Sequence, residues 1–195
     1  MRTMIATPAY DGRVDVRYAD SLARTIALVP DTHAVFWPGE AIVQLARNAL
    51  LQIAVEADVD QVFWIDADEG WEPADFKRIA EDPRDFVTGL VRQKSDKAVY
   101  CVREPDWDSH TVASCGMGFC KMSRNVVQTL WQKSKPYVQD GIERRMAFEV
   151  LLDGHEVISE DIVACRKWGG DIFYDPQALV AHVGTKVYFD KPGIA

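Results

Sequence analysis

Two aspartates, Asp66 and Asp68, directly follow a run of four apolar residues at positions 62–65. A continuous apolar run of this length is typical of a strand that is buried on both faces. In open α/β sheets, ligands bind at the carboxyl ends of the strands, and two carboxylates there could hold a hard divalent cation. Such a cation could act as a Lewis acid on a departing diphosphate. A solvated acidic turn would have the same pattern, so the motif alone leaves both interpretations open.

A second acidic pair, Glu160 and Asp161, follows Ser159 at the predicted start of a helix. Serine is a preferred N-cap residue, and the helix dipole stabilises acidic residues in the first turn, so the pair has a purely structural explanation. The same physics keeps a carboxylate ionised and fixed in direction. Asp161 is therefore also suited to deprotonate an acceptor hydroxyl as a general base.

His182 stands at the end of a predicted strand and is the third feature that could do chemistry. A lone histidine in this setting is more often structural, but an imidazole could also complete a metal site with Asp66 and Asp68. Glu69 and Glu72 lie close to the aspartates in sequence and could be spare ligands. We expect both at the surface instead.

Alternating strands and helices are predicted to position these motifs. The clearest helix covers residues 40–56, where apolar residues recur at i, i+3, i+4 and i+7. Further helices are predicted before Pro30 and from Pro73. Short strands are predicted at 2–6, 33–37, 62–65 and 86–91, the first of them ended by Thr7-Pro8. This alternation predicts an α/β fold with a mainly parallel sheet.

The second half of the chain is less regular. Strands are predicted at 98–102, 111–114, 119–122, 172–174 and 179–183, and helices at 125–132 and 159–168. Gly169 is expected to end the last helix, with Trp168 in the core. Residues 134–142 are expected to form an exposed loop. Because no repeat or linker is visible, we predict a single domain over residues 1–195.

The overall composition excludes several classes of protein. The 195 residues suffice for one domain with a sizeable core, and 48% of them are hydrophobic, which is globular composition. A net charge of −8 disfavours non-specific binding to nucleic-acid backbone. The four cysteines form no CxxC pair, so buried thiols are expected. There is no signal-peptide pattern and no apolar run near the ~18 residues of a membrane span, so we expect action in the cytoplasm.

Four stretches, taken in order, resemble a known family. They are Ala6-Thr7-Pro8-Ala9-Tyr10, Ala46-Arg47-Asn48, Phe63-Trp64-Ile65-Asp66-Ala67-Asp68, and Ser159-Glu160-Asp161 with the segments Cys165–Gly170, Tyr174–Pro176 and His182–Gly184 that follow it. The sequence resembles the short, stand-alone GT-A glycosyltransferases of bacterial and phage genomes, which are related to the large inverting class. The resemblance spans nearly the whole chain. Residues 133–157 match nothing in the family, and in such enzymes this region often shapes the acceptor site.

The resemblance implies a single Rossmann-like GT-A domain, with a mixed, mostly parallel sheet flanked by helices. It implies an inverting transfer of a sugar from a nucleoside diphosphate sugar, with UDP as the first choice, and a Mn²⁺ or Mg²⁺ cofactor. Asp161 would be the catalytic base with Glu160 beside it, and Asp66, Asp68 and His182 would hold the metal. The implied donor-binding residues are Thr7, Pro8, Tyr10, Arg47, Asn48, Asp66, Gly116 and Gly118. A glycan, a protein side chain or a modified DNA base could be the acceptor.

Three alternatives compete with this interpretation. The segment around Asp66 and Asp68 also resembles the nucleophile strand of haloacid-dehalogenase-type phosphatases, although that motif usually lies near the N-terminus and continues differently. A nucleotidyltransferase would share the metal use, but residues 7–13 are a poor version of its glycine-rich loop. A non-catalytic nucleotide-sugar-binding module would keep the fold without turnover.

Overall fold

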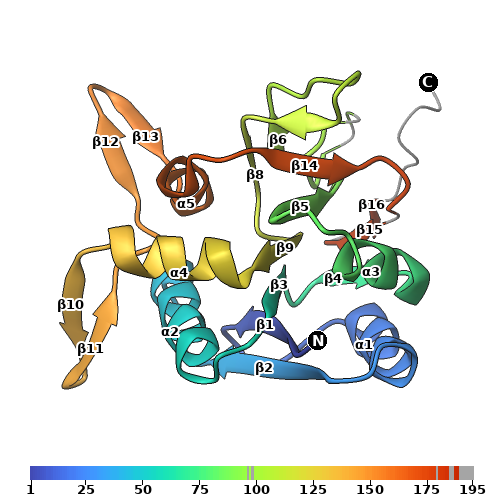
Figure 1. The fold of residues 1–195 in the computed structure, drawn as a ribbon, viewed down its shortest axis with the longest axis horizontal. Helices are drawn as coiled ribbons and strands as arrows, with labels where there is room; N and C mark the ends of the chain where they lie inside the picture. The colour runs from blue at the N-terminus through green and yellow to red at the C-terminus, as the bar shows by residue number, and fades with distance from the viewer. Residues whose placement is uncertain (96, 98, 179, 185–186, 189–195) are drawn as a thin grey trace.

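A central sheet organises the molecule (Figure 1). The computed structural model describes residues 1–95, 97, 99–178, 180–184 and 187–188. Seven strands of this part of the chain form the sheet, in the spatial order β2 (Thr32–Pro38), β1 (Thr3–Ala9), β3 (Gln61–Ile65), β9 (Phe119–Ser123), β5 (Phe86–Gly89), β14 (Ile172–Asp175) and β7 (Thr111–Val112). Among these described strands, β9 and β7 run opposite to the other five. The prediction of an α/β fold with a mainly parallel sheet is confirmed.

Helices cover both faces of the sheet. They are α1 (Val16–Leu28), α2 (Val43–Glu56), α3 (Pro73–Ala80), α4 (Arg124–Lys133) and α5 (Glu160–Trp168). Successive strand residues point to opposite faces, so Trp64 joins the core under α2, α4 and α5, whereas its neighbour Phe63 joins the core under α1 and α3. Both faces of β3 are buried, as its unbroken apolar run predicts.

Smaller strand groups surround this body. They are β4 (Glu69–Trp71) with β15 (Val180–Val183) and β16 (Val187–Tyr188), β6 (Val102–Arg103) with β8 (Ser114–Cys115), and the two hairpins β10 (Pro136–Gln139) with β11 (Ile142–Arg145) and β12 (Leu151–Asp153) with β13 (Glu156–Ile158). Both hairpins project from the same side of the body (Figure 1). Strand β4 was missed by sequence analysis because its three residues contain a glycine and an acid.

The predicted stop at Thr7-Pro8 is wrong, because β1 continues to Ala9. Pro8 lacks an N–H, which is tolerated where one side of a strand is unpaired. The pairing of β1 with β3 ends at Ala6, whereas its pairing with β2 runs on to Ala9. Beyond Ala6 the strand therefore has one free side. This extension carries Pro8 beyond the last residue of β1 that pairs with β3, and Tyr10 directly follows the end of the strand.

Other boundaries also differ from the predictions. Residues 134–142 are not a loop but belong largely to the β10–β11 hairpin, whose turn uses positive φ angles at Asp140 and Gly141. The predicted strand 111–114 is split into β7 and β8, which pair with different partners. Only Val102 of the predicted strand 98–102 lies in a strand, and residues 98 and 179 lie outside the described part.

Helix ends follow the local signals more closely. The helix predicted at 40–56 begins at Val43, after Gly39 with φ 80° and a bond from the Ile42 amide to Glu40 Oε1. Gly169 caps α5 in the left-handed region, with φ 73°, as predicted. None of the helices in the described chain has the length and apolar character needed to cross a membrane.

Candidate functional site

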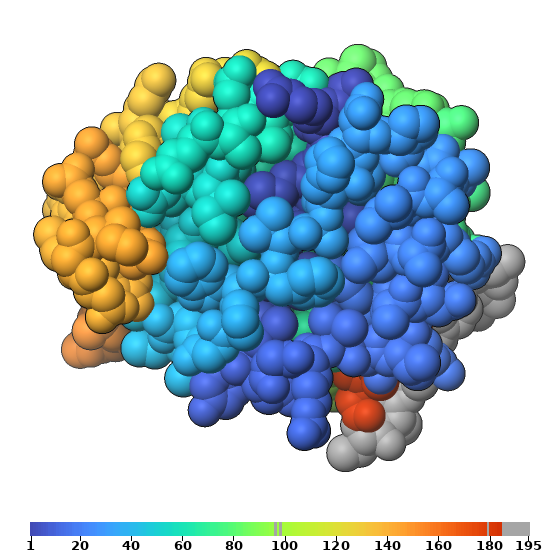
Figure 2. All heavy atoms as spheres, turned by 90° about the horizontal axis from the view of Figure 1, so that it is seen from below, coloured from blue at the N-terminus to red at the C-terminus, as the bar shows by residue number. Residues whose placement is uncertain are grey.

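A large cavity of 680 Å³ opens where β1 and β3 end. Its wall includes six of the residues that sequence analysis selected, namely Pro8, Tyr10, Arg47, Asp66, Asp68 and His182. Figure 2 views the molecule from below, where the red residues near the end of the described chain lie against the blue N-terminal region. Residues from both ends of the sequence therefore build one site, as expected at the carboxyl edge of an α/β sheet.

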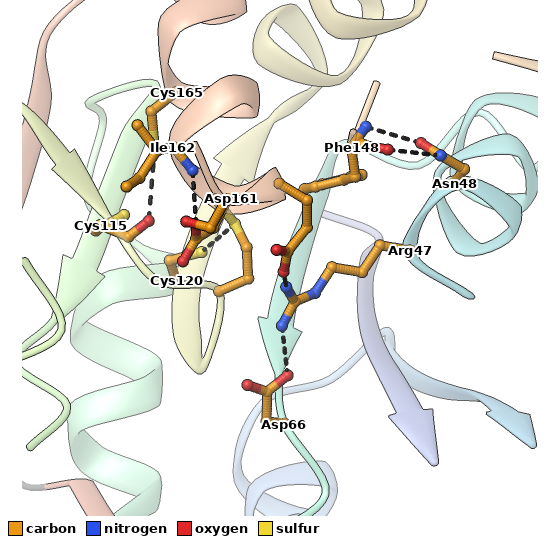
Figure 3. A network of polar contacts seen from close by, with 12 residues as sticks. Arg47, Asn48, Asp66, Cys115, Cys120, Phe148, Asp161, Ile162 and Cys165 are labelled. Carbon is orange, nitrogen blue, oxygen red and sulfur yellow. Dashed lines mark hydrogen bonds and ion pairs between the residues drawn. The ribbon is translucent and has the colours of Figure 1, made fainter. Parts of the chain in front are cut away.

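Arg47 joins the two acidic motifs (Figure 3). It projects from α2, is only 5% exposed, and donates from Nη2 to Asp66 Oδ1 at 2.8 Å. Its Nη1 donates to Glu160 Oε1 at the start of α5. Burial by itself lowers the pKa of Arg47, but the charges of Asp66, Glu160 and Asp161 outweigh it, so the pKa is raised. The guanidinium is therefore a fixed positive charge between the two motifs.

Asp161 faces a second, small cavity of 190 Å³, which Cys101, Arg103 and Gly116 also line. One carboxylate oxygen, Oδ1, accepts hydrogen bonds from Ser159 Oγ and from the Ile162 amide at 2.7 Å. The other oxygen, Oδ2, has no hydrogen-bond partner among the described residues. A Cβ atom at Gly116 would lie 3.6 Å from Oδ2, so glycine leaves this side of the carboxylate open.

Several acidic groups lie near Cys101 and affect its pKa. Its pKa is raised to about 11, first by burial and then by the charges of Glu69, Asp161 and Asp66. These three carboxylates come from β4, α5 and the end of β3. Asp66 lines the large cavity and Asp161 lines the small one, so each cavity borders this acidic centre, which comprises Asp66, Glu69 and Asp161.

Asp68, Glu69 and His182 form a group that could hold a metal ion, with ligand atoms all within 4.8 Å of one another. His182 donates from Nδ1 to the Arg92 carbonyl at 2.7 Å, because a carbonyl can only accept. Its Nε2 therefore carries the lone pair in the neutral ring and faces the two carboxylates. Lys94 Nζ contacts Asp68 Oδ2 in this structure.

Glu69 lies in the interior and not at the surface, so that prediction is wrong, whereas Glu72 is exposed as expected. Neither carboxylate oxygen of Glu69 has a hydrogen-bond partner in the described chain. Burial, followed by the charges of Asp66 and Asp68, raises its pKa well above the usual range. An orphaned buried carboxylate beside an imidazole and a second carboxylate is a donor set that fits a divalent cation.

Four predicted donor-binding residues do not line the large cavity. Thr7 is buried and its Oγ1 lies 2.5 Å from Tyr18 Oη. Asn48 is fully buried, and its amide bonds the main chain of Ala147 and Phe148. Gly116 lines the small cavity. The remaining residue is Gly118.

Gly118 lies against the carboxylate of Glu69. A Cβ atom there would lie only 2.9 Å from Glu69 Oε1. Gly118, which the resemblance implies as a donor-binding residue, therefore packs directly on the buried acid. Tyr18 and Lys94 are not among the residues predicted from the sequence, and Glu69 was considered only as a spare ligand. A weak signal existed only for Glu69, which is next to the Asp-x-Asp motif.

No protein-family model and no curated protein sequence matches this chain. Among solved structures, the chain is similar to protein A197 from STIV, with a TM-score of 0.68 and 19% sequence identity over 100% of this chain and 97% of that one. It is also similar to a glycosyltransferase involved in the glycosylation of the major capsid of PBCV-1, with a TM-score of 0.42 and 11% identity over 66% of this chain and 63% of that one. Identities this low bear on the fold and not on the activity. The chain thus has the fold of protein A197, a mixed α/β sheet flanked by helices.

Proposed function

We propose that this protein is a metal-dependent glycosyltransferase that moves a sugar from a nucleoside diphosphate sugar to a hydroxyl acceptor. The observation that carries the proposal is the Arg47 bridge. It ties Asp66, at the large cavity, to Glu160, which precedes Asp161 at the small cavity. The two acidic motifs are distant in sequence, yet one buried side chain holds them together. A donor site and a base are needed side by side for sugar transfer.

The large cavity is assigned to the donor. Its volume of 680 Å³ lies within the usual range for sites that bind small molecules. Tyr10 and Pro8 on its wall offer apolar surface to a nucleoside, with UDP as the first choice. Asp66, whose carboxylate is oriented by Arg47, would bind the ribose or the sugar of the donor.

Asp68 and His182 on the same wall would hold a divalent cation, with Asp66 beside them. When bound, the cation would supply Lewis-acid stabilisation of the departing diphosphate. Lys94, which contacts Asp68, adds a positive charge to this end of the cavity.

Asp161 is assigned the role of base. Two donors fix its Oδ1, which leaves Oδ2 directed at the small cavity for an acceptor hydroxyl. The acceptor oxygen bonds to the anomeric carbon while the bond from that carbon to the diphosphate breaks. The hydroxyl proton passes to Asp161, and the diphosphate leaves with the bonding electrons. Attack from the face opposite the leaving group inverts the anomeric centre.

The substitution Asp161→Asn tests this assignment. Transfer should fall by at least ~100-fold, since a general base contributes that much or more. Donor binding, measured by calorimetry, should stay nearly unchanged because Asp161 does not line the large cavity. Asp153→Asn is the matched control, since that side chain is 73% exposed in the neighbouring hairpin. An equal loss of binding and transfer would assign Asp161 a structural role instead.

The phosphatase alternative is tested in the same preparation. It requires Asp66 as a free nucleophile, whereas Asp66 is paired with Arg47. A phosphatase would release phosphate from simple esters with Mg²⁺, and such release without sugar transfer would count against the proposal. Candidate acceptors for the transfer assay are glycans, protein side chains and modified DNA bases.

A further inference from the structure

Glu69 is the most unusual side chain near the proposed site. It is 0% exposed, and both of its carboxylate oxygens lack hydrogen-bond partners among the described residues. A buried carboxylate without partners costs free energy, so native proteins seldom keep one unless it has a ligand or a chemical role. An added Cβ atom at Gly118 would lie 2.9 Å from Glu69 Oε1, so the glycine leaves space beside this carboxylate.

The pairing of β4 with β15 places Glu69 opposite His182. The two residues are direct partners in the antiparallel pairing of β4 with β15, which places their side chains on one face. The Val183 amide also donates to the Asp68 carbonyl at 2.8 Å, so Asp68 is tied to the same strand. This register is a backbone property and does not depend on how the side chains are rotated.

The distances suit direct ligation. Nε2 of His182 lies 3.6 Å from Glu69 Oε1 and 3.9 Å from Asp68 Oδ2. Ligands that each bind a cation at 2.0 to 2.2 Å lie roughly 3 to 4 Å from one another. The His182 Nδ1 bond to the Arg92 carbonyl fixes the ring in the way that metal-bound histidines are usually fixed.

Asp66 is paired with Arg47 and is not part of the group formed by Asp68, Glu69 and His182. Its Oδ1 bonds Arg47, which is buried and positively charged. Asp66 is also absent from the group of ligand atoms that lie within 4.8 Å of one another, which comprises Asp68, Glu69 and His182 in the described chain. A cation bound by Asp66 would have to compete with the Arg47 ion pair.

We propose that the protein ligands of the divalent cation are Asp68, Glu69 and His182, and that Asp66 is not a ligand. The presence of the cation rests on the proposed function, whereas the choice of ligands rests on the geometry of β4 and β15. One imidazole and two carboxylates favour Mn²⁺ over Mg²⁺, because Mg²⁺ prefers oxygen ligands and keeps several waters. Glu69 supplies the buried half of the site, and Asp68 supplies the half that faces the large cavity.

Calorimetric titration of the full chain with Mn²⁺ alone, without nucleotide, tests the ligand set. Glu69→Gln should weaken Mn²⁺ binding by at least ~10-fold, because it removes a ligand and not merely a supporting contact. Glu72→Gln makes the same change of charge on an exposed side chain three residues away and should leave the affinity nearly unchanged. Asp66→Asn should cost less than Glu69→Gln. Glu69→Asp, which keeps the charge but withdraws the carboxylate, provides a second variant if the first does not fold.

The outcomes separate this inference from the proposed function. If Asp66→Asn abolishes Mn²⁺ binding while both Glu69 variants bind normally, the inference is overturned and the proposed function keeps its metal site. If Glu69→Gln loses Mn²⁺ as expected but no nucleotide-sugar is ever bound or turned over, the metal site stands and the proposed function fails. Absence of Mn²⁺ binding to the unaltered chain overturns the inference outright. Electron paramagnetic resonance of bound Mn²⁺ should show coupling to the His182 nitrogen, which His182→Gln removes.

Discussion

At the scale of single residues, burial decides what each polar group can do. Arg47 and Glu69 are both buried, but Arg47 is paired with two carboxylates, whereas neither oxygen of Glu69 has a hydrogen-bond partner among the described residues. The first is a stable ion-pair centre whose removal would leave two carboxylates uncompensated. The carboxylate of Glu69 is the one that we propose as a ligand of the cation. Residue type alone could not separate these roles.

Tyr18, which is buried beside Thr7, offers a test of how burial changes a pKa. Burial, and secondarily the charge of Asp66, raise its pKa to about 12, against the lowering effect of the Thr7 hydrogen bond. Because the folded-state pKa exceeds the unfolded value of about 10, the unfolded chain loses this proton first. The free energy of unfolding contributed by Tyr18 should be fully present below pH 10 and should fall as the pH rises towards 12.

Urea titrations of the wild type and Tyr18→Phe at pH 8, 9 and 11 measure this effect. The advantage of the wild type over the variant should shrink by roughly 1 kcal/mol per pH unit above pH 10. Thr7→Val, which removes the hydrogen bond but keeps the volume, should raise the pKa of Tyr18 further. A difference between the two proteins that is constant from pH 8 to 11 would contradict the raised pKa.

At the scale of elements, α2 supports the site on two sides. Arg47 turns towards Asp66, whereas the next residue, Asn48, turns towards the segment before the β12–β13 hairpin (Figure 3). The side-chain oxygen of Asn48 accepts from the amides of Ala147 and Phe148, and its nitrogen donates to the Phe148 carbonyl. The helix therefore fixes the acidic centre and the 133–157 region together.

Asn48→Ala should therefore destabilise the fold without changing the wall of the large cavity. It would leave the buried amide and carbonyl of Phe148 without partners, at about 1 to 3 kcal/mol for each group that water cannot reach, whereas the Ala147 amide keeps its bond to the Arg145 carbonyl. We expect a loss of about 2 to 4 kcal/mol in the free energy of unfolding, measured by denaturant titration. Gln52→Ala, on the same helix, removes only a bond to Glu56 and should change stability by less than about 0.5 kcal/mol. Equal effects of the two substitutions would show that the Asn48 bonds contribute little.

At the scale of the whole molecule, the large cavity would take the proposed donor and the small cavity, which Asp161 lines, the proposed acceptor, while Arg47 links the two acidic motifs. The region 133–157, which matches nothing in the family that the sequence resembles, forms the two hairpins and packs on Asn48 and Glu40. Its contact with Glu40, through Gln139 at 2.8 Å, reaches the wall of the large cavity. This region is therefore placed to influence the large cavity.

Ligand binding to the whole fold is measurable by thermal shift. A nucleoside diphosphate sugar at about 100 times its Kd should stabilise the folded chain by about 2.7 kcal/mol. For a chain of this size the melting temperature should rise by roughly 5 to 10 °C. The shift should require Mn²⁺ and should disappear with EDTA. A shift that persists in EDTA would remove the metal requirement, and the absence of a shift with every nucleotide-sugar would oppose the proposed function.

Features that depend on local patterning could be predicted from the order of the amino acids. The apolar run before Asp66 predicted a doubly buried strand, the periodicity of 40–56 predicted α2 to within three residues, and Gly169 predicted the end of α5. These signals succeed because side-chain periodicity and helix caps act over a few residues. The alternation of elements then predicted the α/β class.

Which acids lie together, and which of them are buried, depends on how distant segments pack in three dimensions. Arg47 and Glu160 are 113 positions apart, and Glu69 meets His182 through the pairing of β4 with β15. Nothing near Glu69 in the sequence predicts its burial, because the residues that exclude water from it come from other parts of the chain. Burial and charge pairing are properties of three-dimensional neighbours, so a local pattern could name Asp66, Asp68 and His182 but could not choose among them and Glu69.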